Sequence, residues 1–182
     1  MDYIHNYTSS KPFYEKNINV LFPNKLGSFE LVNVMDYERQ SPGLGVSLGY
    51  NGYKSNVTIC VYKKAINSFE KGIESDIIIK EMDYSIEEIY QMGNSGEYHK
   101  VNVYSPKKIT YDVGENKLSF RCTIANYVSM SEEMVSLILL CGYKNHIIKI
   151  RYTTSKSIFI DTTEGEKLFD GFMSGLCNLL CQ

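Results

Sequence analysis

The sequence predicts an α+β fold with a largely antiparallel sheet of about six to eight strands and two main helices. The strongest observation is the stretch 136–154, in which residues 137–141 form an unbroken apolar run. A short apolar run bounded by turn residues indicates a strand covered on both faces. After the turn at 142–145, residues 147–152 alternate, with Ile148 predicted to face the core and Lys149 to face water. This hairpin is expected in the middle of the sheet.

The order of the elements is the second observation. Segments with strand patterns precede and follow one helical segment, and a second helix closes the chain. Short turn signals join the strands, and the regular alternation of strands and helices that typifies a parallel sheet is missing from the pattern. Further strands are expected at residues 18–22, 29–37, 45–50, 57–62, 98–104, 108–113 and 117–127.

Turn and cap signals set the boundaries of these elements. Asn51 and Gly52 tolerate positive φ, so they are predicted to form the turn between two strands. Ser75 or Asp76 is expected to cap the first helix, which ends in the glycine-containing segment 93–96. A capping-box pattern at 163–166 precedes the last helix. Its apolar stripe consists of Leu168, Phe172, Leu176, Leu179 and Leu180.

Length and composition bound the domain organisation. A chain of 182 residues, 43% hydrophobic and 22% charged, is long enough for one globular domain with an ordinary core. The first residues are polar and aperiodic, so residues 1–17 are predicted to be a flexible arm and residues 18–182 a single α+β domain.

Charge and cysteine usage disfavour several classes of function. The net charge is −2, and the small basic spots at 63–64 and 107–108 are too sparse for a nucleic-acid surface. No apolar stretch reaches the roughly 18 residues that a membrane helix needs. The odd count of five cysteines favours reduced thiols in a cytoplasmic protein over a disulfide framework, with Cys141 buried. A periplasmic location applies if a signal peptide was removed.

The motifs that resemble reactive sites have structural interpretations. Gly43, Gly45 and Gly49 depart from the spacing of a phosphate loop, and no helix follows them, so turn glycines are favoured. Cys177 and Cys181 lie four residues apart in the last helix, but no second ligand pair has matching spacing, and the three histidines are scattered. The sequence therefore assigns no catalytic, cofactor-binding or metal-ligating residue.

Two parts of the chain carry a resemblance. Residues 22–64 and 147–154 resemble a group of uncharacterised bacterial proteins. The first range has a phenylalanine-proline start, a PGLG turn and a tyrosine-containing strand, and the second has the pattern KIR-T. The order of elements is also similar to the PsbP-like and DcrB-like α/β/α sandwich. That similarity covers most of the chain as topology and brings no catalytic motif. It implies a binding or assembly factor, because proteins on this fold include photosystem accessory proteins, Ran-binding proteins and secretion-effector chaperones.

Tyrosine placement provides the candidate site. The chain has 15 tyrosines, and Tyr50, Tyr53 and Tyr62 flank the first hairpin, where exposed aromatic side chains are typical of protein-binding surfaces. We therefore expect a non-enzymatic module that binds another protein, such as a bacterial adaptor, immunity protein or effector chaperone. Two alternatives stay open: an enzyme with a dispersed site, and an envelope accessory factor whose signal peptide was removed. The sequence names neither the partner nor the oligomeric state.

Overall fold

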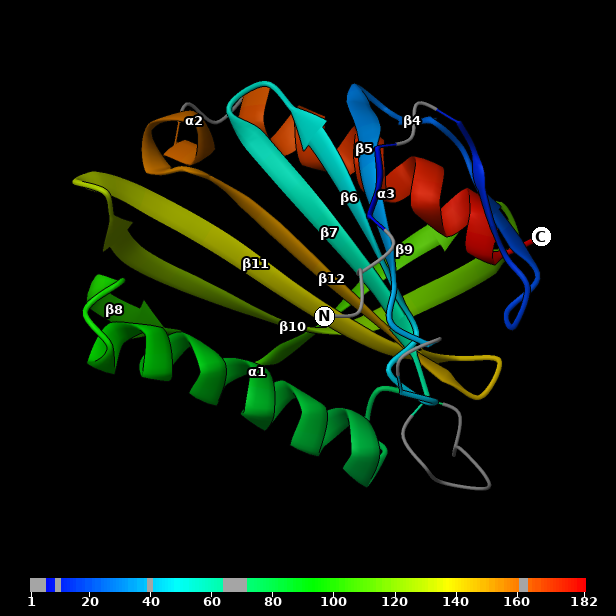
Figure 1. Ribbon diagram of the computed structural model, residues 1–182, viewed down its shortest axis with the longest axis horizontal. Helices are drawn as coiled ribbons and strands as arrows, with labels where there is room; N and C mark the ends of the chain where they lie inside the picture. Colours follow the sequence, from blue (N-terminus) through cyan, green and yellow to red (C-terminus); the bar gives the residue numbers. More distant parts are fainter. Residues whose placement is uncertain (1–5, 9–10, 39–40, 64–71, 161–163) are drawn as a thin grey trace.

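The computed structural model describes residues 6–8, 11–38, 41–63, 72–160 and 164–182. Helix α1 covers one face of a large sheet and helix α3 covers the other, so the protein is an α/β/α sandwich (Figure 1). The helices are α1 (Asp76–Asn94), α2 (Lys156–Ile160) and α3 (Glu164–Leu180). The strands are β1 (Asn6–Thr8), β2 (Phe13–Glu15), β3 (Val20–Phe22), β4 (Lys25–Leu26), β5 (Phe29–Asp36), β6 (Val46–Gly52), β7 (Ser55–Tyr62), β8 (His99–Val103), β9 (Lys107–Val113), β10 (Asn116–Ser129), β11 (Glu132–Tyr143) and β12 (His146–Ser155).

The described strands form a larger sheet than the sequence predicts. Ten strands pair in the order β1-β5-β6-β7-β12-β11-β10-β8, with β4 beside β5 and β9 beside β10. All these pairs are antiparallel, which confirms the predicted α+β class. The expected count of six to eight strands is too low because β1 and β4 have three and two residues. Segments that short carry no periodicity for sequence to reveal.

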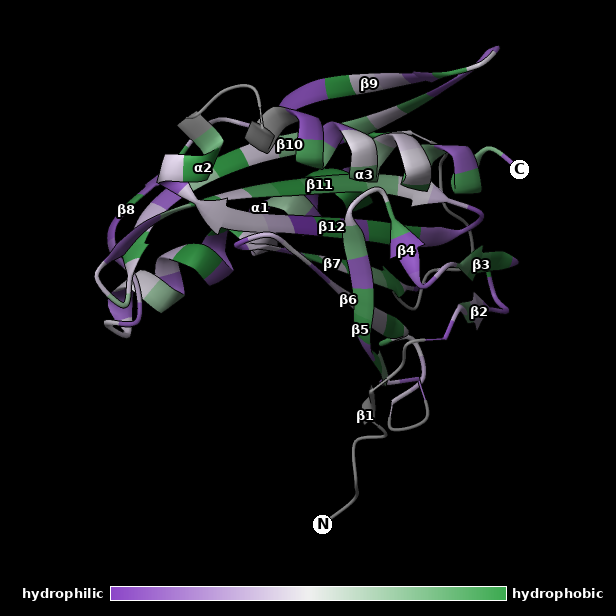
Figure 2. Cartoon of the chain, turned by 90° about the horizontal axis from the view of Figure 1, so that it is seen from above, coloured by the Kyte–Doolittle hydropathy of each residue, from purple (hydrophilic) through white to green (hydrophobic). Residues whose placement is uncertain are grey.

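The hairpin of β11 and β12 lies in the middle of the sheet, as predicted. The middle of β11 is hydrophobic (Figure 2), and residues 135–141 are buried, as expected for a strand covered on both faces. The turn is shorter than the predicted segment 142–145. Lys144 and Asn145 form it alone, with φ of 45° and 61°, because Tyr143 pairs with His146.

The amino-terminal segment differs from the expected arm. Asn6–Thr8 pairs with β5, and Phe13–Glu15 pairs with β3 in a separate two-stranded sheet. The Lys144 amino group also donates a hydrogen bond to the Ile18 carbonyl oxygen at 2.9 Å. Cross-strand backbone bonds compensate here for a polar and aperiodic sequence.

Helix α1 covers part of the sheet face that the alternation in β12 assigns to water. The Lys149 side chain is only 18% exposed, and its amino group lies 3.0 Å from the Glu88 carboxylate of α1. Arg151, on the same face, donates to the hydroxyl oxygens of Ser136 at 3.0 Å and Tyr98 at 3.3 Å. The prediction that Lys149 faces water is therefore wrong, because α1 packs over a strand position that alternation alone marks as polar.

Helix α3 packs its apolar stripe on the opposite face. The Phe172 ring lies at the centre, with ring centroids 5.3 Å from Phe29 and 5.7 Å from Tyr50. Tyr152 of β12 lies 4.7 Å from the Phe169 ring. These edge and tilted contacts, together with burial of whole aromatic side chains, make this face the larger part of the core.

The sheet splits at one end. Strand β10 pairs with β11 from Ser129 back to Arg121, which is opposite Leu140. Beyond that pair both strands continue without pairing to each other in the described chain, while the first half of β10 stays paired with β9 on its opposite edge. Figure 2 shows β9 and the adjoining part of β10 running away from β11. We call this feature the β10–β11 split.

Candidate functional site

Tyr50 is part of the core and not of the surface. Its side chain is 0% exposed, and its hydroxyl donates to the Pro23 carbonyl oxygen at 2.8 Å. Val46, Leu48 and Tyr50 are the buried positions of β6, so alternation places Tyr50 under α3. Burial also raises the pKa of the Tyr50 phenol. The prediction that Tyr50 is an exposed contact residue is wrong.

Tyr62 lies on the other face of the sheet, against α1. It is half-buried, and its hydroxyl donates to a carboxylate oxygen of Glu81 at 2.6 Å. Burial, and then the hydrogen bond with Glu81, raises the pKa of the Tyr62 phenol. A hydroxyl already engaged between sheet and helix is a poor contact for a partner, so the structure separates Tyr62 from Tyr53 rather than joining them in one surface.

Tyr53 is the exposed member of the predicted set, at 66%. It lies in the β6–β7 turn, which the pairing of Gly52 with Ser55 restricts to Tyr53 and Lys54. The predicted Asn51-Gly52 turn is therefore two residues early. The physical reason lies at Gly52, where a Cβ would lie 2.6 Å from the Phe29 ring, so the glycine serves packing within β6 rather than turn formation.

Tyr53 borders a pocket of about 450 Å³ on the α3 side of the molecule. The lining residues are Ser28, Tyr53, Lys167, Leu168 and Gly171, and we call it the Tyr53 pocket. Its walls come from the β4–β5 turn, the β6–β7 turn and the first half of α3, three elements far apart in sequence (Figure 1). The Lys54 amino group lies 5.8 Å from the centroid of the Tyr53 ring.

Two glycines, Gly27 and Gly171, lie where the β4–β5 turn approaches α3, and Gly27 allows the close approach. Gly27 has φ of +56°, and a Cβ there would lie 2.9 Å from the Gly171 backbone carbon. Only glycine fits that position. Gly171 is different, because a Cβ built on it has no neighbour within 4 Å. Because Gly171 has no side chain, the pocket stays open, and no packing contact in the described structure requires glycine at this position.

The glycine motif near β6 binds the protein's own carboxylate. The backbone amides of Gly43 and Gly45 donate to Glu38 at distances between 2.8 and 3.1 Å. Gly45 has φ of +67° and would carry a Cβ only 1.9 Å from the Val61 carbonyl oxygen. Gly43 and Gly45 shape a turn, as predicted, and Glu38 occupies the amides that a phosphate would need. Gly49 is not a turn glycine, because it lies within β6 and pairs with Asn33 and Thr58.

The thiols lie mainly in the core. Cys122, Cys141 and Cys177 are buried, Cys60 and Cys181 are half-buried, and each is a free thiol in the structure. The predicted burial of Cys141 is confirmed, and that burial raises the pKa of its thiol. Within the described ranges, no group of three or more His, Cys, Asp and Glu side chains is arranged to hold a metal ion.

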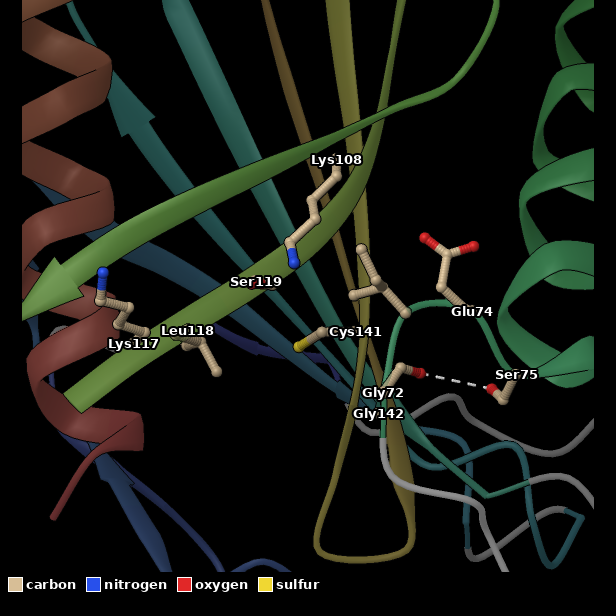
Figure 3. A pocket seen from close by; sticks show the side chains of 10 residues that line it. Gly72, Glu74, Ser75, Lys108, Lys117, Leu118, Ser119, Cys141 and Gly142 are labelled. Atoms are coloured by element: carbon tan, nitrogen blue, oxygen red, sulfur yellow. Dashed lines mark hydrogen bonds between the residues drawn. The ribbon is translucent and has the colours of Figure 1, made fainter.

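A second cavity, of about 540 Å³, lies at the β10–β11 split (Figure 3). It is bounded by Gly72–Ser75 before α1, by Lys108, by Lys117–Ser119 and by Cys141 and Gly142. Sequence analysis did not find it, because its residues share no motif. The nearest signal is the pair of lysines at 107–108, but these lysines indicate a site only once the register of β9 on β10 is known.

Comparison with known proteins supports the fold alone. No protein-family model and no curated protein matches this chain. Among solved structures, the solution structure of cyanobacterial PsbP (CyanoP) from Synechocystis sp. PCC 6803 is similar, with a TM-score of 0.50 and 12% identity. The match covers 94% of this chain and 90% of that chain. No helix in the described residues is long and apolar enough to cross a bilayer. The α/β/α sandwich of this protein is a PsbP-like fold.

Proposed function

We propose that this protein is a non-enzymatic module that binds another protein through the Tyr53 pocket. The observation that carries the proposal is a 66% exposed tyrosine held in a two-residue turn beside an open pocket. Tyrosine supplies a large contact area with few rotatable bonds, and aromatic anchors carry much of the energy of protein interfaces. A reducing compartment suits the five free thiols.

The pocket lining defines the chemistry of the partner. Leu168 and the bare backbone of Gly171 offer an apolar surface for one side chain. Lys167 borders the same pocket, and Lys54 lies next to Tyr53, so the rim carries positive charge. A segment with an apolar residue beside an acidic one matches both features, because charge complementarity at the rim speeds association and selects partners.

The glycine at position 171 is a further reason to expect that a partner side chain occupies this pocket. Glycine inside a helix is about 1 kcal/mol less favourable than alanine. Neither its φ nor a close neighbour requires glycine there. A partner side chain that lies against the α3 backbone would occupy the space beside Gly171, which any larger residue at position 171 would fill.

The test compares variants in capture of a partner from the cells that make this protein. Tyr53→Ala should remove the anchor, and Gly171→Met should fill the pocket while keeping α3 helical. Tyr14→Ala is the matched control, because Tyr14 is 55% exposed on the separate β2–β3 hairpin. Circular dichroism and thermal melts establish that each variant is folded before capture.

The proposal requires a specific protein that is captured by the wild type and by Tyr14→Ala, and lost or weakened at least tenfold with Tyr53→Ala and Gly171→Met. A tenfold loss is about 1.4 kcal/mol, below the 2 kcal/mol typical of an anchor. Equal capture by all four proteins would refute the Tyr53 pocket as the contact surface. The identity of the captured protein would distinguish an adaptor, an immunity protein and an effector chaperone.

A further inference from the structure

The cavity at the β10–β11 split lies between two strands of one sheet that no longer pair. Arg121 and Leu140 form the last paired position, while Lys117–Ser119 and Cys141–Gly142 line the opened space. Among the described residues, backbone N–H and C=O groups on the facing edges lack the strand partner that the rest of the sheet provides. Such groups require water or a ligand as a partner. The split therefore provides donors as well as space.

Positive charge borders the same cavity in an arrangement that costs energy. Lys108 of β9 is directly opposite Arg121 of β10. Like charges directly opposite each other across two strands repel. Arg121 has one ion pair, at 3.5 Å from Glu74, and its Nε atom is buried without a hydrogen-bond partner in the described structure. A negative group near Lys108 would relieve this repulsion.

Lys108 is the lysine suited to a ligand. Lys117 is paired with Asp112 at 3.4 Å, and Figure 3 shows its amino group pointing away from Cys141. The Lys108 amino group points toward Ser119 in the same view, and it forms no ion pair within the described residues. Among the described lining residues, Lys108 is thus a cation without an ion pair, and it lies close to the Ser119 hydroxyl. That hydroxyl shares a hydrogen bond with Thr110 at 2.9 Å, but a hydroxyl can both donate and accept, so Ser119 can still contact a ligand.

Glu74 and Ser75 also line the cavity, but the Glu74 carboxylate is paired with Arg121 at 3.5 Å and the Ser75 hydroxyl donates to the Gly72 carbonyl oxygen at 3.4 Å. The remaining walls are apolar or inert. Ile73 and Leu118 line the cavity, and Cys141 contributes a thiol that points from β11 toward Leu118 (Figure 3). Because burial raises the pKa of that thiol, it stays protonated at neutral pH and is a poor nucleophile. The site is therefore suited to binding rather than to covalent chemistry.

From these observations we propose that the cavity at the β10–β11 split binds the oxyanion of a small amphipathic molecule. Lys108 and the Ser119 hydroxyl hold the carboxylate or phosphate group, and Ile73 and Leu118 contact the apolar part. The volume of about 540 Å³ is within the usual range for small-molecule sites. This ligand site is separate from the Tyr53 pocket, and neither proposal depends on the other.

The test titrates three probes into the full chain and follows backbone amide signals by NMR. Hexanoate carries both the oxyanion and an apolar tail, inorganic phosphate carries the oxyanion alone, and 1-hexanol carries the tail alone. Saturable shifts are expected for hexanoate at Ile73, Ser119 and Gly142. Phosphate shifting the same amides instead would support the oxyanion site and assign it to a phosphate ligand.

Lys108→Met keeps the length of the side chain and removes the charge, so hexanoate should bind at least tenfold more weakly. Lys25→Met is the matched control, because Lys25 is an exposed lysine on β4 with its own ion pair to Glu30, and it should leave the titration unchanged. The proposal is overturned if neither oxyanion shifts these amides, if 1-hexanol binds as well as hexanoate, or if Lys108→Met binds hexanoate like the wild type.

Discussion

Gly171→Ala should make the protein more stable. The substitution removes the helix-interior penalty of glycine, about 0.8–1 kcal/mol relative to alanine. The new Cβ meets no atom within 4 Å, so no packing penalty offsets this gain. A free-energy gain of about 1 kcal/mol raises the melting temperature by roughly 2–4 °C in a protein of this size. Thermal and urea unfolding followed by far-ultraviolet circular dichroism measure both quantities.

Gly27→Ala should have the opposite effect, although Gly27 lies opposite the same stretch of α3. A residue with a side chain at φ of +56° lowers the free energy of unfolding by roughly 1–2 kcal/mol relative to glycine. At position 27 the Cβ would also lie 2.9 Å from the Gly171 backbone. Gly96→Ala is the control, because Gly96 has φ of +84° with no atom within 4 Å of a Cβ. The stability that Gly27→Ala loses beyond the loss in Gly96→Ala measures the cost of the close contact with the Gly171 backbone. A loss of stability in Gly171→Ala would refute this account of the Tyr53 pocket.

Three further predictions concern the core. Ile148→Ala should lower the free energy of unfolding by about 2–5 kcal/mol. Lys149→Met keeps the aliphatic part of the side chain under α1, so it should lower the free energy of unfolding by less than about 1 kcal/mol. Equal losses in urea melts would contradict the register of β12. Cys141 should react with a thiol reagent only after unfolding, and rapid native labelling would contradict its burial. Because the pKa values of Tyr50 and Tyr62 are raised in the folded state, stability should fall above about pH 10 as the unfolded phenols ionise. Tyr50→Phe or Tyr62→Phe should each flatten that slope by about 1.4 kcal/mol per pH unit, and an unchanged slope in denaturant melts at pH 9 to 11 would contradict the shift.

The long elements could be predicted from the sequence because their patterns are strong. The stripe that includes Ile78, Met82 and Ile89 predicts α1, and these side chains are buried in the structure. The central hairpin has both a continuous and an alternating strand. The short helix α2 and the strands β1, β2 and β4 were missed, because five or fewer residues define neither a helical nor a strand period.

The candidate sites were predicted less well. Tyr53 is exposed as predicted, and its role in binding stays a prediction. The exposure of Tyr50 and Tyr62 depends on which face of the sheet each helix covers, and alternation does not specify that. The pocket beside Tyr53 combines Ser28 and Leu168 with the turn, so it exists only after the chain has folded. Likewise, the β10–β11 split begins where the pairing of these two strands ends at Arg121 and Leu140, although β10 stays paired with β9 on its other edge. No residue pattern gives a signal for that end.

The order of strands also has a consequence for how the chain folds. Strands β4 to β7 pair with their sequence neighbours, as do β9 to β12, so each group needs only short loops to close. The two groups join at one seam between β7 and β12, where Ser55 is opposite Thr154. Closing that seam brings together residues separated by about half the chain, which carries the largest loop-closure cost in the sheet. Folding should therefore proceed through two local meanders, and their docking along β7 and β12 should limit the rate.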